Sequence, residues 1–559
     1  MDPAYENSIE RANSKNRWGR DKIAAKILDF ERAKQAQSER QWANDQGVPR
    51  TTLQHWISRK RTLDAAPGVI EFFESPDGVA FLHNMILAAH FEFTKHGVAS
   101  IHNVSNFLDL CGLSRFVASS YATQRRISIK MDEELMLYEQ EERKRLSRQM
   151  RARKITLIED ETFHPEVCLV AMEPVSNYVV VEQYAENREA KTWNNAVEQA
   201  FQDLPVEVIQ VTSDEGSGLI NHALKGLQVH HSSDCFHVSY EISKGTSGAL
   251  ASEVRRSENQ LRIAMARTQK QVRRKQDYES VCPRLRKRRP GFEQAIAVAV
   301  REEQQAEAHL KQAEQNQDTV RIAKAEIGKI YHPYNPETGI GQDAQKVSEL
   351  LESCFDKINE ATQGLSDRCK NRIEKAHRVV SNMVATITFF FRMVELYMDN
   401  MELSDRERTF MRDYLIPGFY LQEVARREKD ARRKADIQAK SQELLALMIE
   451  GDGTPADCDD SALVKLRKAA HECAMMFQRS SSCVEGRNAQ LSLRHHGVHR
   501  LSNRHLSAQT VVHNYYIKRE DGTTPAERFF EAKPRDVFEW LIENMDYPAR
   551  PRVRMLKAS

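Results

Sequence analysis

Short apolar runs between residues 154 and 238 predict a group of β-strands, because they are β-branched, brief and bounded by turn residues. The expected strands are Ile155–Ile158, Val167–Met172, Tyr178–Val181, Val206–Val211 and Leu227–His230. Helical patterns at Asn195–Asp203 and Gly218–Lys225 separate the last three strands. Three strands in succession, then helix, strand, helix and strand, is the order of an α/β RNase H-like domain.

Two acidic residues follow the first and fourth of these expected strands. Asp160 lies in Glu159-Asp160-Glu161, and Asp214 comes directly after Val206–Ser213. Crossover rules place the first and fourth strands side by side. Asp160 and Asp214 would then lie at adjacent strand ends, where open α/β sheets bind their ligands.

The first 62 residues show helical spacing interrupted by a tight turn. A helix over Asp21–Ala36 precedes a second one that Ser38 would cap and Gly47 would end. A third helix begins near Pro49. Small and apolar residues fall where two crossing helices need them, so a helix-turn-helix is expected. Its outward side chains, suited to base edges and phosphates, are Arg50, Thr51, Thr52, Gln54, His55, Arg59 and Lys60. The alternative is a three-helix bundle with a solvated basic face.

Helical periodicity dominates the rest of the chain. Between the first domain and the strands, the pattern predicts helices that include a charged one over Glu133–Lys154. From residue 241 to 476 there is no strand pattern. The charged, amphipathic pattern predicts a helical hairpin formed by Ser247–Asp277 and Pro290–Lys329, with a basic connection at 284–289. Further helices are expected at Asp343–Ala361, Leu365–Met398, Asp405–Met411 and Tyr420–Glu450. The expected divisions are 1–62, 63–150, 151–240, 241–476 and 477–559.

Composition narrows the class of protein. With 559 residues, 29% charged and 40% hydrophobic, the chain is long enough for several globular domains. The net charge is only +2, so basic character is local. Nine cysteines without a Cys-x-x-Cys pair argue against a zinc ribbon or a disulfide framework. No signal peptide is evident, and the most apolar stretch, Val384–Phe391, is too short to span a bilayer. A cytoplasmic location, without membrane association, is expected.

A third carboxylate, Glu485, opens a basic helical segment near the C-terminus. Hard cations such as Mg²⁺ take oxygen ligands, and a metal pair needs carboxylates on rigid elements. If Asp160, Asp214 and Glu485 converge, the chain can cleave and join nucleic acid. Glu159 and Glu161 are the alternatives one residue from Asp160, and Glu215 is the alternative to Asp214.

Two other interpretations of the glutamate remain open. Ser482-x-x-Glu485 matches a capping box, and Glu472 is the nearest competing carboxylate. The polar and basic stretch beyond Glu485 would be explained by contacts to a DNA backbone; its expected contact residues include Arg487, Asn488 and Arg494.

Asp234 and His237 follow the last expected strand. They could support the metal site, or form a strand-end turn with a satisfied histidine. Cys235 and His237 alone are too few ligands for zinc.

Several short motifs in the same order resemble bacterial DDE transposases that have a helical insertion before the glutamate. The motifs are Asp160-Glu161-Thr162-Phe163, Ser213-Asp214-Glu215-Gly216, Asp234-Cys235-Phe236-His237-Val238, Val484-Glu485-Gly486-Arg487-Asn488 and Thr523-Thr524-Pro525 through Phe530. The resemblance covers nearly the whole chain. It departs from compact integrase-like proteins, since Asp214 and Glu485 are 271 positions apart (485 − 214).

The resemblance implies a mostly α, multidomain transposase with an RNase H-like core. Asp160, Asp214 and Glu485 would hold two Mg²⁺ ions, which Mn²⁺ could replace. The expected partners are double-stranded DNA, as terminal repeats of a mobile element and as target, and further copies of the chain in a dimeric or larger synaptic complex. A bacterial, nucleoid-associated location follows. The alternatives are a transposase-derived DNA-binding regulatory or architectural protein, and an RNase H-like nuclease without strand transfer.

Overall fold

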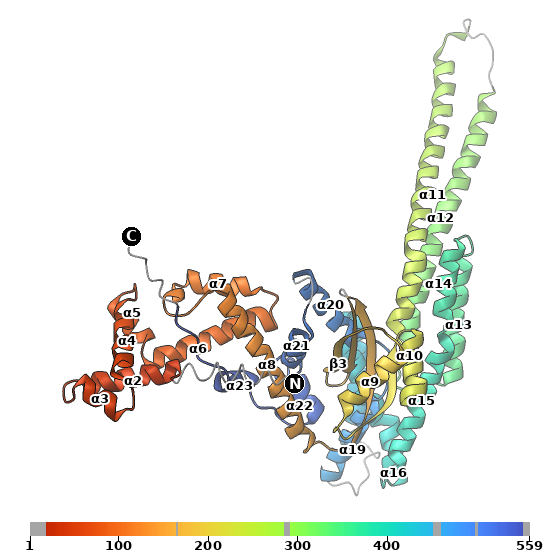
Figure 1. The fold of residues 1–559 in the computed structure, drawn as a ribbon. Helices are drawn as coiled ribbons and strands as arrows, with labels where there is room; N and C mark the ends of the chain where they lie inside the picture. Colours follow the sequence, from red (N-terminus) through yellow and green to blue (C-terminus); the bar gives the residue numbers. More distant parts are fainter. Residues whose placement is uncertain (1–17, 164–165, 284–290, 451–459, 498–500, 552–559) are drawn as a thin grey trace.

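A mixed five-stranded sheet lies near the middle of the molecule (Figure 1). The computed structural model describes residues 18–163, 166–283, 291–450, 460–497 and 501–551. The strands are β1 (Arg153–Phe163), β2 (Val167–Glu173), β3 (Tyr178–Ala185), β4 (Val206–Ser213) and β5 (His230–Ser233). Their order is β3-β2-β1-β4-β5, antiparallel up to β1 and parallel from β1 to β5. The expected adjacency of the first and fourth strands is therefore confirmed.

The strand limits differ from the expected ones at two places that affect the site. β1 does not end before the acidic residues but continues to Phe163, because β2 pairs with it from Ile158 to Phe163, with Asp160 opposite Val170. β5 begins only at His230. The preceding residues His222–Leu227 form the π-helix η3, and Gln228 adopts a left-handed turn with φ 58°.

Helices cover both faces of the sheet, because successive strand residues point to opposite faces and apolar side chains occur on both. On one face, α9 (Ala190–Phe201), α10 (Ser217–Asn221) and η3 bury Leu157, Val211 and Trp193. On the other face, α20 (Ser482–Gly497) and α21 (Asn503–Tyr515) bury Ile158 and Val484 together. A helix encoded more than 300 residues after β1 thus completes the layer over β1.

Three short helices form the N-terminal unit, as the sequence predicts. They are α2 (Arg20–Ala33), α3 (Glu39–Asp45) and α4 (Arg50–Arg61), around a core that includes Trp42, Leu53 and Trp56. Ser38 accepts a hydrogen bond from the Gln41 N–H, and Gly47 has φ 62°. Both turn residues therefore act as expected.

The segment between this unit and the sheet is helical. It contains α5 (Pro67–Phe73), α6 (Pro76–His90), the π-helix η1 (Phe91–His96), α7 (Ile101–Leu110), the short 3₁₀ turn η2 (Leu113–Arg115) and α8 (Tyr121–Ser147). The charged helix was expected at Glu133–Lys154. It begins earlier because its first turns bury Gln124, Ser128 and Met131, and it ends earlier because Arg153 and Lys154 pair with β4.

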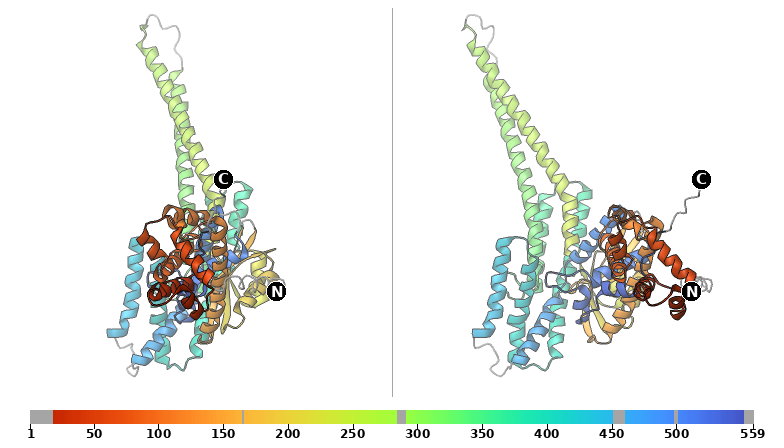
Figure 2. Two further views of the ribbon diagram at one scale, coloured as in Figure 1. Left: turned by 60° about the vertical axis from the view of Figure 1, so that its left-hand side comes forward. Right: turned by 90° about the vertical axis from the view of Figure 1, so that its left-hand side faces the viewer.

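The described parts of the segment between β5 and α20 (234–283, 291–450 and 460–481) are mostly helical, as expected, and include one isolated β-bridge. Helices α11 (Cys235–Ser280) and α12 (Phe292–Ile330) form a long antiparallel hairpin that projects well beyond the remaining helices (Figures 1 and 2). The basic connection at 284–289 lies outside the described residues. At the base of the hairpin lie α13 (Ala344–Ala361), α14 (Asp367–His377), α15 (Val380–Asp399), α16 (Asp405–Phe410), η5 (Met411–Leu415), α17 (Ile416–Arg427), α18 (Ala431–Glu450) and α19 (Asp460–Met475). Two of the expected helices are each divided in two, near Arg378 and near Glu428.

By length and composition alone, Asp367–Asp399 resembles a membrane span. It comprises two helices, and α15 buries Met383, Ile387 and Phe390 in the apolar core of the insertion. The apolar composition of α15 is therefore explained by packing within the protein.

The C-terminal segment returns to the N-terminal helices. After α21, α22 (Pro525–Phe530) and α23 (Val537–Asn544) pack with α8 and η1. Beyond them, Arg550 pairs with the buried carboxylate of Glu74, and the Ala118 N–H donates to the Ala549 carbonyl at 2.9 Å. The last described residues therefore contact the helices between the N-terminal unit and the sheet.

Candidate functional site

Asp160 and Asp214 lie on neighbouring parallel strands. Ile158 of β1 is in register with Thr212 of β4. Asp160 lies two positions after Ile158, and Asp214 lies two positions after Thr212. Because side chains alternate, Asp160 projects to the same face as Ile158, which packs against α20. Both carboxylates are half-buried.

Glu485 lies in the first turn of α20, on the same face of the sheet. Val484 beside it is buried against Ile158, so α20 is held directly over β1. The pKa of Asp160 is raised from 3.8 to about 7, first by burial and then by the negative charges of Glu485, Asp214 and Asp234. The pKa of Glu485 is also raised, by burial and by Asp234. Four carboxylates from distant parts of the chain therefore share one region.

The neighbouring acidic residues of β1 point away from this region. Glu161 accepts a hydrogen bond from Trp193 Nε1 at 3.2 Å and pairs with Arg188 at 3.3 Å. Glu159 is buried and contacts His222 at 3.2 Å. Both lie on the α9 face, so Asp160 is the member of the acidic run that faces Glu485.

The other alternative carboxylates each accept a hydrogen bond from another side chain. Glu472 lies on α19 and accepts a hydrogen bond from the Tyr397 hydroxyl at 2.5 Å. Glu215 accepts a hydrogen bond from the Ser233 hydroxyl, and it lines the same small pocket as Asp214. The capping-box interpretation of Glu485 is not supported either. Its N–H donates to the Ser481 carbonyl, so Ser482 is already helical and Ser481 precedes the helix.

Asp234 has a clear structural role at this site. Its Oδ1 accepts hydrogen bonds from the N–H groups of Phe236 (2.9 Å) and Ser481 (3.1 Å), and its Oδ2 accepts one from the Ser481 hydroxyl (2.6 Å). One side chain therefore caps α11 and fixes the residue before α20. Asp234 positions Glu485 relative to the end of β5.

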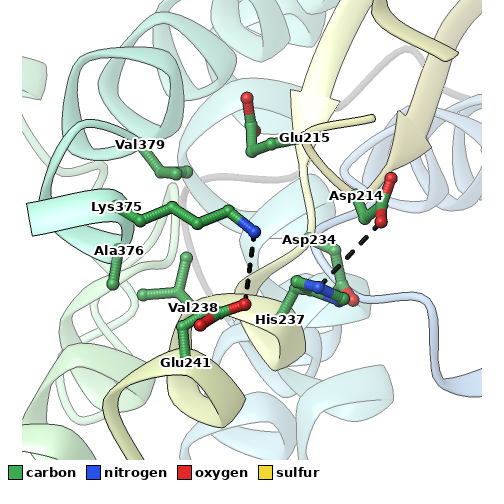
Figure 3. A pocket seen from close by; sticks show the side chains of 9 residues that line it. All are labelled: Asp214, Glu215, Asp234, His237, Val238, Glu241, Lys375, Ala376 and Val379. Atoms are coloured by element: carbon green, nitrogen blue, oxygen red, sulfur yellow. Dashed lines mark hydrogen bonds and ion pairs between the residues drawn. The ribbon is translucent and has the colours of Figure 1, made fainter. Parts of the chain in front are cut away.

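His237 lies one turn along α11, with Nε2 4.0 Å from Asp214 Oδ2 (Figure 3). A small pocket beside this pair also has Glu241 and Lys375 in its wall, and Lys375 donates to Glu241 at 3.2 Å. His237 therefore lies next to Asp214, and the Lys375–Glu241 ion pair lies in the wall of the same pocket. Lys375 comes from the helical insertion, which contributes directly to the surroundings of the site.

Asn488 contacts Asp160 directly, a role that the sequence did not predict. Its Nδ2 donates to Asp160 Oδ2 at 2.8 Å, while its own buried Oδ1 has no hydrogen-bond partner. Asn488 lies three residues after Glu485, and this spacing places the two side chains on one face of α20. That spacing is the signal by which the role could have been found.

The donor chemistry of the site suits a hard cation. Asp160, Asp214, Glu485 and the unpartnered Asn488 Oδ1 offer only oxygen atoms, which Mg²⁺ and Mn²⁺ prefer. Within the described residues, no three His, Cys, Asp or Glu side chains converge closely enough to ligate one ion. Asp160 is held by Asn488 and by the Glu161 N–H, and Asp214 Oδ1 is held by the Gly216 N–H. Binding of one ion by all three carboxylates would therefore require these side chains to move.

The raised pKa of Asp160 has a consequence for stability that can be measured without DNA. Between about pH 3.8 and 7 the folded protein binds the Asp160 proton more tightly than the unfolded chain does. The contribution of Asp160 to the free energy of unfolding therefore falls as the pH rises through this range. In a metal chelator, Asp160→Asn is expected to unfold at a higher temperature than the wild type at pH 8. The difference should disappear near pH 4, and an equal difference at both pH values in thermal unfolding would contradict this assignment.

The basic residues of α20 are mostly used inside the protein, contrary to the expectation of DNA contacts. Arg487 is 3% exposed and forms a two-point ion pair with Glu182 of β3, both contacts at 2.6 Å. Arg494 donates to the carbonyls of Lys95, His96 and Gly97 at the end of η1. These arginines join α20 to β3 and to the N-terminal helices.

The candidate DNA-contact residues of α4 divide into two groups. Arg50, Thr51, Gln54 and His55 are exposed, although Gln54 donates to Glu39 at 3.0 Å. Thr52 is half-buried. Lys60 pairs with Glu31 at 3.2 Å, and Arg59 donates to the Pro551 carbonyl at 2.5 Å. The first group is available to a ligand, whereas Arg59 and Lys60 stabilise the unit and its contact with the C-terminal segment.

Comparison with known proteins gives one partial match. Residues 411–557 match a family of unknown function, DUF6399. The matched region runs from η5 through α20 to the C-terminal segment, so it includes Glu485 and Asn488 but neither Asp160 nor Asp214. The comparison with curated proteins finds no match.

Proposed function

We propose that this protein is a DDE transposase, which cleaves the ends of a mobile element and joins them to target DNA. The observation that carries the proposal is that Asp160, Asp214 and Glu485 lie near one another on one face of the sheet, where burial and the other carboxylates raise the pKa of Asp160 to about 7. The strand order β3-β2-β1-β4-β5, with three antiparallel and then two parallel strands, supports an RNase H-like core. The N-terminal three-helix unit would be the helix-turn-helix.

In this proposal Asp160, Asp214 and Glu485 hold two Mg²⁺ ions, for which Mn²⁺ can substitute. The metals would supply activation of the attacking oxygen and stabilisation of the leaving oxygen in an in-line displacement. Asn488 holds the Asp160 carboxylate on the α20 side, and Asp234 fixes the start of α20 through Ser481. His237 lies beside Asp214, where it could donate a hydrogen bond to a phosphate of the substrate.

The partners in this account are double-stranded DNA and further copies of the chain. Recognition of the terminal repeats would come from the exposed residues of α4, and pairing of two ends requires a dimer or larger synaptic complex in the bacterial nucleoid. An RNase H-like nuclease would share the carboxylates but would not join DNA ends. A regulatory protein derived from a transposase would bind the ends without cleaving them.

The test is a cleavage and joining assay. Labelled duplex carrying the repeats that flank the gene is incubated with target plasmid and Mg²⁺ or Mn²⁺. The proposal predicts nicks at the element boundary and joined product. Cleavage without joining would favour the nuclease, and end binding without cleavage would favour the regulatory protein.

Recognition by α4 can be tested separately from chemistry. Arg50→Ala is expected to weaken binding to the terminal repeats by about tenfold or more, because one base or phosphate contact contributes about 1–3 kcal/mol. Lys34→Ala is the matched control, since it removes one exposed cation from the same unit outside α4. Titration of labelled end DNA measures both, and equal affinities for the two variants would contradict the role of α4.

A further inference from the structure

The outward face of α11 is strongly basic along the part that projects from the molecule. Six exposed cations form what we call the α11 stripe: Arg255, Arg256, Arg262, Lys270, Arg273 and Arg274. We propose that this stripe binds the phosphate backbone of double-helical DNA, independently of base sequence. The proposal rests on the proposed function only for the choice of DNA as the polyanion.

Helical geometry places the stripe opposite the seam of the hairpin. Leu250, Ser257 and Ala264 are buried against α12 at seven-residue intervals. At about 100° per residue, the six cations fall within about 120° of one another on the other side of the helix. The stripe therefore points away from α12 into solvent.

The cations of the stripe are not neutralised by the protein. Cations of α11 that lie nearer to α12 form ion pairs with acidic residues of that helix. Arg267 pairs with Glu302 and Lys275 pairs with Glu293, each at 2.6 Å. Among the described residues, no member of the stripe has an ion-pair partner. Arg255, Arg262 and Arg274 donate only to oxygen atoms of α11 itself. Uncompensated charge on a rigid helix is costly to assemble and favours a polyanionic partner.

The length of the stripe suits a duplex. From Arg255 to Arg274 the helix rises about 29 Å, at about 1.5 Å per residue, which is close to one turn of DNA at about 34–36 Å. An anionic membrane would be expected to meet an apolar rim, whereas Ile263 and Met265 are the only large apolar side chains exposed between Arg255 and Arg274. Figures 1 and 2 show that α11 is the helix of the hairpin nearer to the sheet. DNA held at the candidate site can therefore pass along the stripe.

The test compares two triple variants of the full chain with equal changes in charge. Arg262→Gln/Lys270→Gln/Arg273→Gln removes cations from the stripe, and Arg301→Gln/Lys311→Gln/Arg321→Gln removes exposed cations from α12. Binding to a duplex of random sequence is measured in chelator at several salt concentrations, with circular dichroism as a check on folding. The stripe variant should bind tenfold or more weakly at low salt. Its slope of log affinity against log salt should fall by about 2–3, since each phosphate contact contributes about 0.9. The α12 variant should match the wild type.

Equal effects of the two triple variants, or an unchanged slope in the stripe variant, would overturn the inference. Stripe-dependent binding to phosphatidylserine vesicles without stripe-dependent binding to DNA would also overturn it. Because the assay contains no divalent metal and no element ends, its outcome does not depend on cleavage. If the stripe variant bound DNA like the wild type, the carboxylate assignment would not be affected. If Asp160→Asn kept its cleavage activity, the assignment of the stripe would not be affected.

Discussion

Asp160→Asn is expected to abolish metal-dependent cleavage of end DNA while leaving binding of the same DNA unchanged. The substitution keeps the size of the side chain, but removes a carboxylate whose pKa is raised by the nearby charges of Glu485 and Asp214. A loss of about a hundredfold to a thousandfold is expected, the scale seen when a group that stabilises the transition state is removed. Gel assays of nicking and of end binding measure the two effects on one substrate.

The adjacent carboxylate provides a matched control. Glu161→Gln makes the same chemical change one residue away, on the opposite face of β1, where Glu161 contacts Trp193 and Arg188. It should retain most of the cleavage activity. If Glu161→Gln were inactive and Asp160→Asn active, the catalytic carboxylate would lie on the α9 face of β1. That result would contradict the proposed site.

Arg487→Met is expected to cause the largest loss of stability among the substitutions considered. It leaves the buried carboxylate of Glu182 without its two-point partner, with only the Thr510 hydroxyl still donating to it. Breaking a buried ion pair by removing one member typically costs about 3–5 kcal/mol. Hydrogen exchange of amides in β3 and α20 measures the free energy of opening of this part of the protein.

Two further variants separate this effect from a general sensitivity to arginine loss. Arg267→Met breaks an exposed pair with Glu302 and should cost less than about 1 kcal/mol. Glu182→Leu combined with Arg487→Met should recover part of the lost protection, because no charge is then left buried. If Arg487→Met instead weakened DNA binding with unchanged exchange, the sequence-based expectation of a DNA contact would be correct after all.

The sequence predicts best where a local pattern determines the outcome. Alternation in β1 places Ile158 and Asp160 on one face, and connection rules alone are enough to set β1 beside β4. The turn chemistry of Ser38 and Gly47 likewise determines the limits of α3. In both places neighbouring residues carry the necessary information.

The sequence fails where the deciding partner is far away in the chain. Arg487 looks like a surface cation until Glu182, 305 positions earlier, is brought against it. Asp234 looks like a turn residue until Ser481 packs on it. The basic composition of α20 therefore suggests DNA contact. In the structure, Arg487 instead pairs with Glu182 inside the protein, and Arg494 donates to a carbonyl near the end of η1.

Mapping of the metal site by local backbone cleavage tests the central claim most directly. Fe²⁺ can take the place of Mg²⁺ at oxygen ligands, and with ascorbate and peroxide it generates radicals that cut the nearby polypeptide. The account predicts cuts near Asp160, Asp214 and Glu485 together, competed by Mg²⁺ and lost in Asp160→Asn. Cuts confined to one of these segments, or centred on Glu472, would contradict the convergence of the three carboxylates.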